Sequence, residues 1–184
     1  MWFGVACDEQ RVFGTSFATT QQKALKSLLD ALPFNVHLQL FSEQTAFAED
    51  VLALVKDVYD GKGASQVLPL ATTHLSGYTR RVLEVTALIP VGYVASYGAV
   101  AEASGGSARA VGNVMAANPF APVVPCHRVV GAGFTLGGYS GLQVKRDILN
   151  REKRGYTFPQ EIIVNNGKLQ VFPVEFVLRK LGKA

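Results

Sequence analysis

The sequence predicts an α/β protein of two domains, an N-terminal α/β domain over residues 1–73 and a C-terminal domain over residues 74–184. Of the 184 residues, 48% are hydrophobic and 17% charged, which favours a compact core and excludes disordered, collagen-like and low-complexity chains. Strand and helix patterns mix in the first domain, whereas helical patterns dominate the second. No apolar run approaches the roughly 18 residues of a membrane-spanning helix, so we expect no membrane partner.

The N-terminal domain is expected to contain two strands of a hairpin, a helix, a half-buried strand and a second helix. Thr19 and Thr20 are suitable N-caps for the first helix, which Pro33 ends, and Gly61 ends the second. The predicted elements, in order, are 3–7, 11–17, 21–32, 34–40 and 43–60.

The C-terminal domain is expected to begin with three helices, at 76–89, 97–103 and 108–117. Ser96 and Ser107 can cap the second and third, which a glycine turn separates. Two short helices around such a turn are typical of a helix-turn-helix, although ordinary helix packing would give the same outline. Farther along, a tail over about 156–184 contains a predicted hairpin around an Asn-Gly turn.

Charge and cysteine content narrow the classes of function. The net charge is +4, but residues 1–75 have five basic and eight acidic side chains, whereas residues 76–184 have thirteen and six. The basic half is expected to meet a polyanion. Two cysteines, Cys7 and Cys126, are too few for a disulfide framework or a recognisable zinc site, so we expect no metal. The N-terminus does not resemble a signal peptide, and we expect a cytoplasmic protein, or a nuclear one in a eukaryote.

The segment 123–130 is the strongest candidate for chemistry, because a thiol, an imidazole and a guanidinium interrupt an apolar stretch. A cysteine is a nucleophile as its thiolate, which a neighbouring base promotes. In an extended chain Cys126 and His127 would point to opposite faces, so a turn or a bridging water is required. Glu152 is a candidate to orient the imidazole.

Six blocks in a fixed order resemble one family. Pro125-Cys126-His127-Arg128-Val129-Val130 is similar to the active-site signature of the O6-alkylguanine-DNA alkyltransferases, the methylated-DNA–protein-cysteine methyltransferases. The resemblance extends over residues 76–155. The other matching blocks are Ser96-Tyr97, Ala108-Arg109-Ala110-Val111-Gly112, Asn118-Pro119, Gly138-Tyr139-Ser140-Gly141, and Lys145 with Leu149 and Glu152.

The resemblance implies a fold and an activity. The N-terminal domain would be ribonuclease H-like, and the C-terminal domain helical, with a helix-turn-helix and an active-site cysteine loop. Cys126 would accept the alkyl group of O6-alkylguanine, with O4-alkylthymine as a further candidate substrate, in one irreversible transfer without a cofactor. The partner would be double-stranded DNA containing alkylated bases, which a monomer would bind through the minor groove.

The resemblance also implies catalytic roles. His127 would act through a water as the base for the Cys126 thiol, and Glu152 would polarise His127. Tyr97 would donate a proton to the leaving guanine and crowd the phosphate on its 3′ side. Asn118 would tie the active-site turn to the helix-turn-helix.

Further positions would contact DNA or the flipped base. Arg109 would enter the base stack at the position that the flipped base vacates, and small residues of the same helix would approach the minor groove closely. The DNA-contacting set is Arg109, Tyr97, Ala108, Ala110 and Gly112, and the base pocket is lined by Tyr139, Ser140 and Val129.

Structural explanations compete with several of these roles. Tyr97 and Tyr139 could be packed aromatics, and Lys145 and Glu152 an exposed helical face; for Arg128 we favour a structural ion pair. Three other functions are considered: an alkyl-base recognition protein that does not repair, a helix-turn-helix transcription regulator, and a cysteine hydrolase. The thiol argues against the first, and the lack of a distant His and Asn or Asp pair argues against the last.

Overall fold

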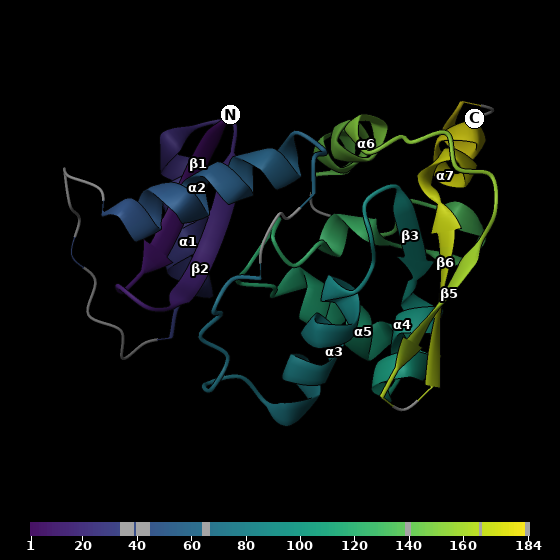
Figure 1. The fold of residues 1–184 in the computed structure, drawn as a ribbon, viewed down its shortest axis with the longest axis horizontal. Helices are drawn as coiled ribbons and strands as arrows, with labels where there is room; N and C mark the ends of the chain where they lie inside the picture. The colour runs from purple at the N-terminus through teal and green to yellow at the C-terminus, as the bar shows by residue number, and fades with distance from the viewer. Residues whose placement is uncertain (34–38, 40–44, 64–66, 139–140, 166, 183–184) are drawn as a thin grey trace.

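A computed structural model describes residues 1–33, 39, 45–63, 67–138, 141–165 and 167–182 (Figure 1). At one end of the molecule, the N-terminal hairpin and two helices form a small unit, in which the second helix packs on the hairpin around buried Val12, Val51 and Val55 and the first contacts the hairpin through buried Leu28. The hairpin is antiparallel, and the hydroxyls of Thr20 and Thr45 cap the two helices. These elements are β1 (Trp2–Cys7), β2 (Val12–Ala18), α1 (Gln21–Ala31) and α2 (Ala46–Tyr59).

The structure confirms the predicted hairpin and both predicted helices in this region. The second helix begins later than expected, because Thr45 takes the capping position and Ala46 the first turn. Of the strand predicted at 34–40, only Gln39 is described, outside any element; the rest lies outside the described residues. The ribonuclease H-like description therefore stays a prediction.

The described part of the C-terminal region contains five α-helices. The hydroxyls of Ser76, Ser96 and Ser107 each accept a backbone N–H three residues along and thereby cap the first three helices. These three helices confirm the predicted ones, with the first ending at Ala87 instead of residue 89. The helices are α3 (Gly77–Ala87), α4 (Tyr97–Ser104), α5 (Ala108–Ala116), α6 (Leu142–Arg151) and α7 (Val174–Leu181).

The expectation of a helical C-terminal domain is wrong in part, because a four-stranded sheet forms there in the order β4-β3-β6-β5. The tail hairpin is confirmed as β5 (Gln160–Val164) and β6 (Gly167–Pro173), whereas β3 (Tyr93–Ser96) and β4 (Val129–Val130) were not predicted. Strands of four and two residues are too short to show an alternating pattern. β3 runs parallel to β4 and antiparallel to β6.

Backbone contacts join the two regions. The Val12 N–H donates to the Pro69 carbonyl at 2.9 Å, and the Thr15 N–H donates to the Pro119 carbonyl at 2.8 Å. Strand β2 is thus attached to the segment that leads into the Cys126 turn. The boundary at residue 73 stays a prediction. Within the described part of the chain, no helix has both the length and the apolar character needed to span a bilayer.

Candidate active site

The Cys126-containing segment forms a turn. Cys126–Arg128 is one turn of 3₁₀ helix, in which the Arg128 N–H donates to the Pro125 carbonyl at 2.8 Å. The chain then enters β4, which pairs with β3 and so fixes the end of the turn. Cys126 is 3% exposed and His127 is fully buried. The turn that a neighbouring thiol and imidazole would require is therefore present.

His127 is oriented by Glu152, which caps the C-terminal end of α6. The His127 Nε2 and Glu152 Oε1 atoms are 2.9 Å apart, and both side chains are fully buried. An ionised carboxylate only accepts hydrogen bonds, so Nε2 donates and Nδ1 keeps its lone pair. Nδ1 is buried and has no hydrogen-bond partner among the described residues. The free proton-accepting atom of this ring is therefore Nδ1.

Arg128 holds the same carboxylate from another side. Its Nε lies 3.0 and 3.1 Å from the two oxygens of Glu152, its Nη2 lies 2.8 Å from Oε1, and its Nη1 donates to the Ile89 carbonyl at 2.6 Å. Burial alone would raise the pKa of Glu152, but His127 and Arg128 outweigh it and lower that pKa to about 2. The structural ion pair favoured for Arg128 is confirmed, and an exposed Glu152 is wrong.

Burial also determines the charge of the imidazole. It lowers the pKa of His127 below its ordinary value, and the opposing effect of Glu152 does not reverse this. His127 is consequently neutral at neutral pH. A neutral imidazole with a free Nδ1 can accept a proton from a neighbouring thiol, directly or through a water.

Lys145 is a further buried charge in the site. Its Nζ donates to the Val129 carbonyl at 2.6 Å and to the Leu136 carbonyl at 2.7 Å, and burial lowers its pKa to about 8. The expectation of an exposed lysine is wrong, since the side chain is fully buried. A sequence signal was available: Lys145, Ile148, Leu149 and Glu152 have the spacing of one helix face, and two of the four are apolar.

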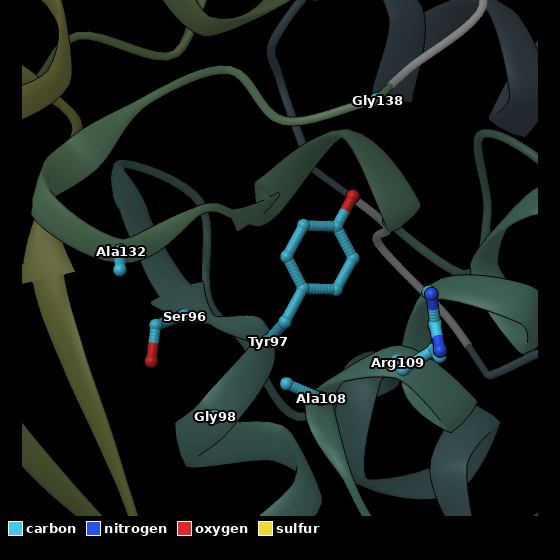
Figure 2. Close-up of a pocket in the computed structure, with 8 residues that line it drawn as sticks. Ser96, Tyr97, Gly98, Ala108, Arg109, Ala132 and Gly138 are labelled. Carbon is cyan, nitrogen blue, oxygen red and sulfur yellow. The ribbon is translucent and has the colours of Figure 1, made fainter.

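A cavity of about 600 Å³ lies between α4, α5 and the segment that follows β4. Figure 2 shows the ring of Tyr97, which lines this cavity, between Arg109 on one side and Ala132 on the other. Tyr97 is half-buried; burial, followed by the charge of Cys126, raises its pKa, so it stays protonated. The described lining residues are Ser96, Tyr97, Gly98, Ala108, Arg109, Gly112, Ala132 and Gly138.

The small residues of α5 face open space. A Cβ added at Gly112 would meet no atom within 4 Å, so close helix packing does not explain this glycine. Ala108 and Arg109 are exposed in the first turn of α5, and Ala110 is half-buried. The open face of α5 therefore offers room for the close approach of another molecule.

Asn118 links the end of α5 to the Cys126 turn. Its Nδ2 donates to the Val124 carbonyl at 2.9 Å, and its Oδ1 accepts the Phe120 N–H at 3.0 Å. Of the three predicted base-pocket residues, Val129 is fully buried and does not line the cavity, whereas Tyr139 and Ser140 lie outside the described residues. Over the described ranges, no group of three or more metal-ligating side chains is found.

Comparison with known proteins adds independent findings. A family model described as the DNA-binding domain of 6-O-methylguanine DNA methyltransferase matches residues 77–154. A methylated-DNA–protein-cysteine methyltransferase from Mycobacterium leprae is 42% identical over 117 residues, which are 60% of this chain and 68% of that protein. The chain spans about half the length, 43% to 50%, of several other curated relatives of the same name.

Solved structures give the same likeness across more of the chain. The O6-methylguanine-DNA methyltransferase of Pyrococcus kodakaraensis superposes with a TM-score of 0.65 at 30% identity, covering 82% of this chain and 90% of that one. Mycobacterium tuberculosis OGT in complex with DNA superposes with a TM-score of 0.56 at 26% identity, covering 81% and 84%. The α/β fold thus matches that of these structures.

Proposed function

The chain belongs to the O6-methylguanine-DNA methyltransferase family, and from that premise we propose that it repairs DNA by transferring the alkyl group of O6-alkylguanine to Cys126. The observation that supports this most is the buried imidazole of His127, the residue that directly follows Cys126 in the 3₁₀ turn: its Nε2 is held by Glu152, and its Nδ1 has no hydrogen-bond partner among the described residues. Such a ring can take the thiol proton.

The transfer balances with the chain's own groups. The sulfur of Cys126 attacks the alkyl carbon, so an S–C bond forms as the bond from that carbon to O6 breaks. The thiol proton passes through a water to Nδ1 of His127, which the carboxylate of Glu152 stabilises as an imidazolium. The product thioether is stable, so each molecule acts once and needs no cofactor.

Tyr97 serves the leaving base. Its raised pKa keeps the phenol protonated, and its ring lines the cavity that would receive a flipped guanine. Donation of its proton to N3 of the base neutralises the charge that develops as the bond to O6 breaks. Proton return from His127 through solvent then restores both residues. Asn118 keeps the Cys126 turn fixed to α5 through the Val124 carbonyl.

Helices α4 and α5 would act as a helix-turn-helix, and DNA would bind across them. The exposed first turn of α5 and the unfilled space over Gly112 suit close approach to the minor groove. Flipping a base out of a duplex costs a few kcal/mol, and the planar guanidinium of Arg109 replaces part of the lost stacking. Tyr139 and Ser140 are proposed to complete the base pocket.

The remaining features of the proposal follow from this role. Lesions occur in any sequence, so binding would depend mainly on phosphates and not on base identity. We expect a monomer that acts where DNA lies, in the cytoplasm or the nucleus, with O4-alkylthymine as a further candidate substrate. The N-terminal unit would be the ribonuclease H-like domain of the family.

A stoichiometric assay tests the proposal. The protein is mixed with a duplex that contains one O6-methylguanine, followed by intact mass analysis, peptide mapping and digestion of the DNA to nucleosides. We expect one methyl group on Cys126, one restored guanine, and no further reaction. Cys126→Ser should abolish transfer, whereas the matched control Cys7→Ser should not. Tight binding of the damaged duplex without methylation would indicate a lesion-recognition protein instead.

A further inference from the structure

The C-terminal tail, residues 156–182, has no part in the chemistry proposed above, yet it packs beside the site. Helix α7 buries Val174 and Val177 against Val94 of β3, Val130 of β4 and Leu149 of α6. Glu175, in its first turn, accepts the N–H groups of residues 154 and 155, which lie two and three residues after Glu152. The tail therefore completes a small core that touches three of the elements from which the site is built.

The same helix holds the loop that follows the Cys126 turn, residues 131–138, which we call the 131–138 loop. Phe134 contacts the rings of Phe172 and Phe176 edge-on, at centroid distances of 5.2 and 5.7 Å. The Lys180 ammonium donates to the Gly133 carbonyl. The tip of the loop is thus attached to α7 by a ring cluster and by a charge-assisted hydrogen bond.

The backbone at this attachment is strained. Phe134 has a φ of 64°, and it is the one non-glycine residue with left-handed backbone across the described ranges. A bulky side chain in this region is unfavourable and persists only where surrounding contacts hold it. The ring cluster with Phe172 and Phe176 provides those contacts. The conformation of the loop therefore depends on the tail.

The other end of the loop forms part of the cavity. Leu136 is tied by its carbonyl to the buried Lys145. Gly137 packs directly on Tyr97, since an added Cβ would lie 2.9 Å from Cε2 of the ring. Ala132 and Gly138 line the cavity, and Figure 2 shows Ala132 on the opposite side of Tyr97 from Arg109. A shift of the loop tip would thus change the space beside Tyr97.

We infer that α7 is a positioning element for substrate: Phe176 and Lys180 hold the 131–138 loop so that the cavity beside Tyr97 fits an alkylated base. The inference rests on the proposed alkyl transfer and adds a specificity role for the tail. Phe176 contacts the ring of Phe134 and Lys180 donates to the Gly133 carbonyl, so the inferred role of both acts through the loop.

Lys180→Met and Phe176→Leu test the inference, because both change partly or fully exposed side chains and should leave the fold intact. The assay follows methylation of Cys126 by free O6-methylguanine over a range of concentrations, which separates apparent affinity from the limiting rate. For Lys180→Met we expect apparent affinity to fall about five-fold, the effect of one lost hydrogen bond, and Phe176→Leu should lower it through the lost ring contact. In both variants the limiting rate should stay within about two-fold of wild type, since the His127 cluster is untouched. Lys180→Arg should restore affinity.

Matched controls come from the same tail. Lys168→Met removes an exposed lysine of β6 that pairs with Glu161, and Phe158→Leu changes a ring that is 79% exposed. Both should behave as wild type. Equal losses in controls and test variants, or a loss confined to the limiting rate, would overturn the inference.

Hydrogen exchange separates failure of this inference from failure of the proposed function. Amides of residues 131–138 should exchange faster in Lys180→Met and Phe176→Leu than in Lys168→Met, whether or not the protein transfers alkyl groups. If wild-type protein does not transfer, the proposed function fails, and the exchange result still shows whether α7 holds the loop. Unchanged exchange in both test variants would contradict the inference directly.

Discussion

In the N-terminal region the ion pairs lie at the surface, whereas in the C-terminal region His127, Arg128, Lys145 and Glu152 are enclosed together. The four described N-terminal ion pairs have side chains that are 34% to 75% exposed, but the side chains of the Arg128–Glu152 pair are at most 7% exposed. Exposed pairs add roughly 0–1 kcal/mol, while buried charges cost several kcal/mol to desolvate.

The surface ion pairs and the buried charged cluster serve different purposes. Surface pairs such as Lys56–Asp60 need no role beyond solubility and modest helix support. A buried histidine, arginine, lysine and glutamate are expensive to enclose, and in this chain all four lie on or beside the segment that includes Cys126. Stability alone would favour apolar residues at these positions, so we attribute the cluster to chemistry.

The largest expected effect comes from Glu152→Gln. It leaves the buried Arg128 guanidinium without a counter-charge, so we expect a loss of about 3–5 kcal/mol in the free energy of unfolding. Methyl transfer should also slow, because His127 loses its anionic partner. Asp60→Asn breaks an exposed pair and should cost no more than about 1 kcal/mol. Urea unfolding measures the free energy of unfolding of both variants. Similar losses in the two would contradict the proposed difference between the buried and the exposed ion pairs.

Replacement of the imidazole should affect rate more than stability. In His127→Gln the side-chain amide can still bond to Glu152 but cannot accept the thiol proton, so transfer should fall about 10²- to 10⁴-fold. Single-turnover kinetics with free O6-methylguanine provide the measurement. The exposed His74→Gln is the matched control and should react as wild type. A loss under about ten-fold in His127→Gln would mean that the ring is not the base.

Arg109→Ala tests the DNA-facing side of the site. The variant should accept the methyl group from a duplex about ten-fold more slowly, because no side chain then fills the position that the flipped base leaves in the stack. Its rate with the free base should stay unchanged. Arg11→Ala, in the N-terminal hairpin, controls for the loss of one positive charge. Equal slowing with both substrates would contradict the role. Binding of the duplex by wild-type protein should weaken steeply with added salt.

The smallest effect is on pH dependence. Because burial lowers the pKa of His127, its base form persists below its ordinary pKa of about 6.5, and the transfer rate should stay flat from about pH 7.5 to that value. Below about pH 6.5 the unfolded chain binds a proton that the folded chain does not, so stability should fall as pH falls. A rate that halves at the ordinary histidine pKa would show a solvated ring.

Local signals predicted most of the helices. Caps such as Thr20, Ser76 and Ser107 and the helical spacing of apolar residues are properties of short segments, and the structure has each helix they indicate. The residue types and the resemblance to a family indicated Cys126, His127 and Glu152; of these, His127 and Glu152 lie 25 residues apart in the chain, but their Nε2 and Oε1 atoms are 2.9 Å apart. No local pattern could predict that contact.

The missed features depend on tertiary contacts. β4 has two residues and exists because it pairs with β3. Lysine side chains usually lie at the surface, and the burial of Lys145 is explained by its hydrogen bonds to the carbonyls of Val129 and Leu136. Helix α7 has no capping side chain to mark its start. Its packing beneath the 131–138 loop follows from the fold, not from its own sequence.

Proton transfer from Cys126 requires a neutral His127 with its proton on Nε2. The test is nitrogen NMR of protein labelled with ¹⁵N-histidine, with His37→Gln and His74→Gln changed together so that one ring remains. At neutral pH we expect the neutral tautomer protonated at Nε2, with an unprotonated Nδ1. An imidazolium, or the tautomer protonated at Nδ1, would contradict the claim that this cluster prepares a base for Cys126.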